Sequence, residues 1–213
     1  GGKEKTYMAW DGISADQMAL NPRYNPAGLY TNAEGEEVYY PNQTDNYWQQ
    51  HFQFHYSERF TRWLTFNATL HYTHGGGYYE QMKADAKYSS FGKDGFYNED
   101  GDFIKRTNVI RQKHLNNHFY GGVAALNVRT EPVDAVVGGA VNNYNGHHWG
   151  LAWDDLYKTF ENFEFYRNTG DKLDANVYAK VAWRAVNQAS RRLTVFGDLQ
   201  YRFVDYRING IND

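Results

Sequence analysis

The sequence predicts an all-β protein: an antiparallel meander of about six long strands, forming part of a transmembrane β-barrel with long extracellular loops. Three observations predict it. Six segments alternate apolar and polar residues with period two. These segments reach ten or more residues, against about five or six in soluble sheets, and a tilted membrane strand needs about 9–11. Short and long connections follow one another in turn, as in outer-membrane barrels.

The composition excludes several other classes. The 213 residues are 18% aromatic, which argues against disorder, although the mean hydropathy is -0.80. Cysteine is absent, so disulfide frameworks and thiolate sites are excluded. The net charge of -3 gives no support for a nucleic-acid partner, and we expect none.

The alternation is clearest in the first hairpin. Trp48, Phe52 and Phe54 occupy even positions, whereas His51 and His55 occupy odd positions. We call these two alternating sets of positions, which point to opposite faces of a strand, the apolar and the polar parity. The same design recurs in two further hairpins, with tight turns expected near residues 58–62, 130–132 and 188–192. The predicted strands cover about residues 46–57, 63–75, 107–129, 133–146, 173–187 and 191–206.

The remaining segments are expected to be extracellular loops at about residues 1–45, 76–106, 147–172 and 207–213. Because consecutive strands alternate in direction, the short turns share one end of the sheet and the long segments share the other. With six strands, both chain ends are expected in loops. Such long loops argue against a compact soluble domain, but outer-membrane barrels have them on the extracellular side.

The two possible architectures differ in what the apolar side chains contact, lipid or a protein core. In a barrel these side chains face lipid, and aromatic residues near the strand ends form interfacial girdles. The side chains expected to face outward are Phe52, Phe54, Leu64, Phe66, Leu70, Val177 and Leu199. The alternative is a soluble extracellular carbohydrate-binding β-domain, in which the same side chains form a core and other aromatics stack on sugars.

Six strands are too few to close a membrane barrel. Single-chain bacterial barrels begin at eight strands, and open edges are not tolerated in lipid. We therefore expect this chain to be part of a larger barrel. As an isolated fragment it is expected to self-associate through its apolar face or its open edges.

Several segments, in order along the chain, resemble TonB-dependent outer-membrane receptors of the Bacteroidetes type. They are Gly2–Gly12, Tyr24–Gly28, Asn42–Tyr47, His51–Tyr56, His71–Tyr79 and Tyr206–Gly210. The resemblance implies a barrel of 22 strands in the cell outer membrane of a Gram-negative bacterium, with an N-terminal plug that contacts the TonB complex. Such receptors import a scarce small-molecule ligand: an iron chelate (siderophore), cobalamin or similar. The plug is absent from this sequence, so contact with TonB is expected of the full-length protein only.

Two sets of residues are candidates for ligand contact. The polar parity of the strands predicts a lumen lining by His51, His55, His71, Arg129, Arg184 and Arg202. His51 and His71 are expected opposite or diagonal to each other, within reach of a shared ion; the alternative is polar lining that contacts plug or water. Loop aromatics can stack on a ligand or pack on one another: Tyr78, Tyr79, His147, His148, Trp149 and Trp153.

Other motifs predict local structure rather than chemistry. Gly75–Gly77 is expected where a strand bends into a loop, and Asn98–Asp102 is expected to form a polar β-turn rather than a calcium loop. Ser14 and Gln17 have the spacing of a helix capping box. No catalytic constellation is present, so we expect a non-enzymatic protein without cofactor or bound metal. The sequence does not identify the ligand.

Overall fold

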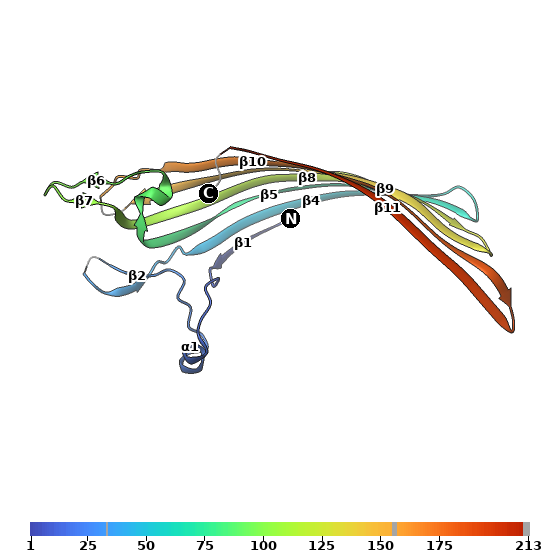
Figure 1. Ribbon diagram of the computed structural model, residues 1–213, viewed down its shortest axis with the longest axis horizontal. Helices are drawn as coiled ribbons and strands as arrows, with labels where there is room; N and C mark the ends of the chain where they lie inside the picture. Colours follow the sequence, from blue (N-terminus) through green and yellow to red (C-terminus); the bar gives the residue numbers. More distant parts are fainter. Residues whose placement is uncertain (33, 155–156, 211–213) are drawn as a thin grey trace.

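The computed structural model describes residues 1–32, 34–154 and 157–210, and these residues form an all-β protein (Figure 1). Its main element is a seven-stranded antiparallel sheet with the order β1-β4-β5-β8-β9-β10-β11. The strands are β1 (Gly2–Tyr7), β4 (Thr44–Arg59), β5 (Leu64–Lys87), β8 (Arg106–Arg129), β9 (Val133–Asp154), β10 (Phe163–Gln188) and β11 (Arg191–Gly210). In this part of the chain the sheet is open, with β1 and β11 at its edges.

The smaller elements lie in the long connections. Helix α1 (Ala15–Leu20) and the pair β2 (Leu29–Thr31) and β3 (Glu37–Tyr39) lie between β1 and β4. A 3-10 helix, η1 (Tyr88–Phe91), and the pair β6 (Phe96–Tyr97) and β7 (Phe103–Ile104) lie between β5 and β8. Nowhere in the described ranges is a helix long and apolar enough to cross a membrane.

The strand register gives the main sheet two unlike faces. Phe52 pairs with Tyr72, and Tyr72 pairs with Tyr120, so the apolar parities of successive strands fall on one face. No second layer covers this face among the described residues. Of the seven side chains expected to face outward, Phe52, Phe54, Leu70, Val177 and Leu199 are 59–81% exposed, and Leu64 and Phe66 are half-buried.

The sheet is arched, and the apolar face is its convex one. Helix α1 hangs from the concave side (Figure 1). Trp10, in the same connection, contacts Tyr79 with ring centroids 5.2 Å apart. Tyr79 shares its face with the polar parity of β4, because it pairs with Asp45. The polar parity therefore lines the concave side.

The apolar band covers only part of the convex face. It runs along residues 64–72, 120–128, 133–141 and 195–203 of β5, β8, β9 and β11, which is about nine residues per strand and at the low end of what a tilted membrane strand needs. Beyond it, toward the long connections, the convex face turns polar with His74, His118, Asn145, Asp171 and Arg207, which form one cross-strand row.

The predicted sorting of the connections is confirmed. The short turns at residues 60–63, 130–132 and 189–190 share one end of the sheet, and the connections 8–43, 88–105 and 155–162 share the other. The last two are shorter than expected, because the strands extend much further toward that end.

Residues 1–45 were wrongly expected to be a loop throughout. β1 pairs with β4 from Gly2↔Gln49 to Tyr7↔Thr44, which gives seven strands, and the N-terminus lies beside β4 rather than in a loop. β1 cannot be recognised from alternation, because Lys3 and Lys5 on one face and Glu4 on the other are all polar.

The expected loops at 76–106, 147–172 and 207–213 were also largely wrong. β5 continues to Lys87, β9 continues to Asp154, β10 begins at Phe163 and β11 reaches Gly210; residues 211–213 lie outside the described part. In these extensions both faces mix polar and aromatic side chains with a few aliphatic ones such as Met82 and Leu151, so period two disappears from the sequence. Gly75–Gly77 accordingly lies inside β5 rather than at a bend.

A small core closes the end with the long connections. Tyr88, Phe91 and Phe160 pack on Val109 and Ala152, and the rings of Tyr88 and Phe160 stack with centroids 5.1 Å apart. Two local predictions are confirmed. The turn Asn98–Asp102 joins β6 and β7, with Asn98 Oδ1 accepting from the Asp102 N–H, and Ser14 and Gln17 form the capping box of α1.

Glycines inside the strands make room for aromatic rings on the sheet surface. A Cβ at Gly138 would lie 2.7 Å from the Tyr178 ring and 2.9 Å from the Ala124 carbonyl oxygen, whereas a Cβ at Gly197 would meet nothing within 4 Å. We therefore expect Gly138→Ala to lower the free energy of unfolding by about 1–3 kcal/mol, through overpacking against backbone. Gly197→Ala, the control, should be neutral or stabilise by up to about 1 kcal/mol. Urea unfolding in detergent measures both, and equal effects would contradict this account.

Candidate ligand-binding site

The residues predicted to contact a ligand from loops lie on strands instead. Tyr78 and Tyr79 are in β5, and His147, His148, Trp149 and Trp153 are in β9. Because neighbours along a strand point to opposite faces, the set is divided. Tyr79 and His148 lie on the concave face, whereas Tyr78, His147, Trp149 and Trp153 lie on the convex face. They cannot form one site.

The six residues predicted to line a lumen all lie on the concave face: His51, His55, His71, Arg129, Arg184 and Arg202. The two histidines expected to share an ion are diagonal in register but engaged separately. His51 Nδ1 lies 3.0 Å from Thr73 Oγ1, and His71 Nε2 lies 2.8 Å from Asn142 Oδ1. In the described ranges, no three His, Cys, Asp or Glu side chains gather as metal ligands.

The three arginines of this set form ion pairs with two carboxylates. Arg184 Nη2 and Arg129 Nε donate to the two oxygens of Asp134, at 2.5 and 3.1 Å. Arg184 also donates to the Glu131 carbonyl at 2.6 Å, which braces the turn between β8 and β9. Arg202 pairs with Asp174. These contacts join strands, so the arginines are poor candidates for an anionic ligand.

A different group of cations gathers near the long connections. We define the concave cationic cluster as Lys83 of β5 with Arg111 and Lys113 of β8, flanked by Tyr79 and Tyr166. Cross-strand pairing brings them together, since Tyr79 pairs with Lys113 and Gln81 pairs with Arg111. Tyr166 is buried, and the other four side chains are half-buried.

Neighbouring side chains fix the positions of two of the cations. Arg111 Nε and Nη2 both donate to Gln81 Oε1, at 3.1 and 2.9 Å. Lys113 Nζ lies over the Tyr166 ring, 5.5 Å from its centroid. Gly150, between Lys113 and Tyr166 in the cross-strand row, permits this contact, because a Cβ there would collide with the Tyr166 ring.

The positive charges of the cluster repel one another, which favours the binding of an anion. Burial, and then the charges of Arg111 and Lys83, lower the pKa of Lys113 to about 8. Burial also lowers the pKa values of Lys83 and Arg111. Burial raises the pKa of Tyr166 to about 12 and also raises the pKa of Tyr79, so both phenols stay neutral at physiological pH. A bound anion would relieve the repulsion among the cations.

Only Tyr79 of this cluster was found from the sequence. Lys83 fell in an expected loop, and Tyr166 fell in another. A usable signal was present in Arg111 and Lys113, which are two residues apart in a predicted strand and therefore share a face. The arrangement can hold a small anionic ligand between two aromatic rings, and it contains no nucleophile paired with a base.

Comparison with protein-family models and with curated proteins finds no match for this chain.

Proposed function

We propose that this chain is part of the wall of a TonB-dependent receptor barrel in the cell outer membrane, which imports a scarce ligand such as an iron chelate or cobalamin into the periplasm. The observation that carries the proposal is the exposed apolar band on the convex face. Val177 and Leu199 are 61% and 81% exposed there, and exposed apolar patches of this extent mark contact with lipid or protein.

Two further features support a barrel in lipid. The concave face is more polar than the convex band, although it also exposes Phe119, Val123, Phe196 and Val204. The long connections share one end, as extracellular loops do. The open edges point the same way. β1 covers β4 only as far as Gln49, and β11 has no partner on its outer side in the described part of the chain. Further strands of a larger barrel would pair with both edges, as lipid requires.

The concave cationic cluster bears on the ligand. Lys83, Arg111 and Lys113 favour an anion, and Tyr79 and Tyr166 add ring surfaces. Among the ligands that such receptors take, this combination favours an anionic iron chelate over an uncharged one. Energy for import would come from the TonB complex through a plug, as the resemblance implies.

The alternative is a soluble extracellular carbohydrate-binding β-domain. It requires a second layer over the apolar band, and the convex exposure of Phe52, Phe54 and Leu70 argues against one. The two candidates differ in topology, since only the barrel places the two ends of the sheet on opposite sides of a membrane.

Single cysteines test this topology cleanly, because the chain has none of its own. Asp100 lies in the exposed turn between β6 and β7, and Ser190 lies in the exposed turn between β10 and β11. In intact cells we expect a membrane-impermeant maleimide to label Asp100→Cys but not Ser190→Cys. Permeabilising the outer membrane should make both react. Equal labelling in intact cells, or recovery of the chain in the soluble fraction, would refute the proposal.

A further inference from the structure

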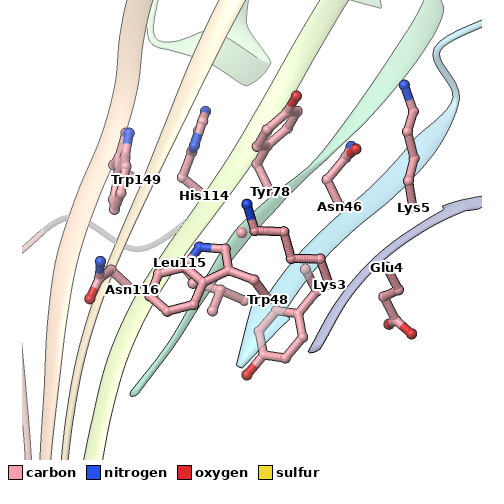
Figure 2. Close-up of a pocket in the computed structure, with 13 residues that line it drawn as sticks. Lys3, Glu4, Lys5, Asn46, Trp48, Tyr78, His114, Leu115, Asn116 and Trp149 are labelled. Atoms are coloured by element: carbon pink, nitrogen blue, oxygen red, sulfur yellow. The ribbon is translucent and has the colours of Figure 1, made fainter. Parts of the chain in front are cut away.

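The convex face carries a hollow, which the transport proposal does not use. It has a volume of about 640 Å³ and lies over β1, β4, β5, β8 and β9 (Figure 2). We name it the convex hollow, and its convex-face side chains are those of Lys3, Lys5, Asn46, Trp48, Tyr78, His114, Asn116 and Trp149.

One wall of the hollow is a cross-strand row of rings. Figure 2 shows Lys5, Asn46, Tyr78, His114 and Trp149 side by side across the strands, as the register requires. The rings of Tyr78 and His114 lie 5.0 Å apart between centroids. His114 stacks on Trp149 at 4.9 Å with an interplanar angle of 9°.

The floor is formed by a glycine and an indole. Gly76 has no side chain, and Trp48 lies against it, since a Cβ at Gly76 would be 3.0 Å from Trp48 Cζ2. Trp48 also meets His74 edge-on at 4.7 Å. The hollow therefore offers flat, partly buried ring surface, which suits the apolar face of a sugar ring.

Its charge is positive. Lys3 and Lys5 are exposed at its rim, and neither forms an ion pair within the described residues. Glu4, between them, points to the opposite face because it pairs with Tyr47. Burial lowers the pKa of His114, so that ring is neutral at pH 7. The two lysines are thus left to meet an anionic group.

The position of the hollow identifies the source of that group. The apolar band ends at Tyr72, and the cross-strand row of Tyr78 lies three rows further along the convex face. At about 3.3 Å per residue, this separation is about 20 Å along the strand. Strand tilt reduces this height above the band, to the level of headgroups and their sugars. The connection after β1 turns to the concave side, where Gln81 Nε2 lies 3.7 Å from Met8 Sδ, so it leaves the hollow open.

We infer that the convex hollow binds the phosphorylated sugar headgroup of an outer-leaflet glycolipid. A sugar ring packs on Trp48 and Tyr78, and its phosphate is held by Lys3 and Lys5. Trp149 supports the row from behind, because His114 stacks on its ring and the Arg167 guanidinium covers it. This inference rests on the proposed function, because it requires the apolar band below the hollow to face lipid.

The test uses the full-length receptor of which this chain is proposed to be part, reconstituted in phosphatidylcholine vesicles, and measures binding of a radiolabelled diphosphorylated disaccharide lipid to it. We expect saturable binding. The double variant Lys3→Gln/Lys5→Gln should weaken it at least about tenfold, as loss of charge-assisted hydrogen bonds does. Trp48→Leu should weaken it as well. Lys180→Gln removes one exposed lysine from the concave face and is the matched control, which should bind as the unaltered chain does.

Three lipid outcomes would overturn the inference while leaving the transport proposal intact. They are absence of binding to inserted protein, equal binding of the dephosphorylated lipid or of phosphatidylglycerol, and full binding by the double lysine variant. Displacement by inorganic phosphate at the affinity of the lipid would also overturn it. Failure of the full-length receptor to insert in the vesicles would overturn both proposals together.

Discussion

Val177→Arg is expected to destabilise the protein in a lipid bilayer by about 2–4 kcal/mol, the cost of an arginine near the middle of a lipid-facing barrel surface. Val177 is 61% exposed on the convex face, and its cross-strand neighbours Gly139 and Tyr201 lie within the apolar band. In a soluble domain, a side chain this exposed accepts arginine within about 0.5 kcal/mol. The change in the free energy of unfolding therefore shows whether the convex face contacts lipid or water.

The matched control is Gln200→Arg on the neighbouring strand. Gln200 is exposed, lies on the concave face and pairs with Tyr178, at nearly the same height as Val177. We expect its effect to stay within about 0.5 kcal/mol, because a polar lumen face accepts charge. Reversible urea unfolding in phospholipid vesicles measures both variants. Equal free energies of unfolding would exclude the convex face as a lipid surface.

Anion binding by the concave cationic cluster is expected to weaken about tenfold between pH 7 and pH 9.5. This factor corresponds to the lower end of the free-energy range for losing one charge-assisted hydrogen bond. Lys113, whose pKa is lowered to about 8, carries most of its charge at pH 7 and loses it as the pH rises. An anion binds the protonated form better, so affinity is high below that pKa and falls above it. Citrate, titrated against the full chain in detergent, is a suitable probe.

Two variants separate this titration from general effects of pH. Lys113→Arg keeps its charge throughout the range, so its affinity for citrate should change little up to pH 9.5. Lys113→Gln should bind at pH 7 as weakly as the unaltered chain binds at pH 9.5. If Lys113→Arg loses affinity as steeply as the unaltered chain, Lys113 is not the group whose titration controls anion binding.

The parts of the fold that could be predicted are those where the two faces differ in chemistry. In residues 64–72 and 133–141 one parity is apolar, so the strands, their hairpin partners and their short turns follow from period two. Beyond Tyr72 both faces become mostly polar or aromatic, and the strands continue to Lys87 and Asp154 without a sign of alternation in the sequence. Backbone pairing, which carries no signature in side-chain type, extends them.

The candidate sites show the same division. Residue types alone brought Tyr78, Tyr79, His148 and Trp149 into one predicted group, but a strand sends successive side chains to opposite faces. Pairing instead joins Tyr79 to Lys113 on the concave side and Tyr78 to His114 on the convex side. Both sites are therefore built across strands, from residues far apart in the chain.

By itself, the sequence determined that this protein is an all-β meander with one apolar and one polar face, because alternation is local and survives in the order of the residues. Only the tertiary structure decided that β1 joins the sheet, how far each strand runs, and which cations share a face with which rings. Those features depend on the register between strands, which is set by pairing along their whole length and not by any one segment.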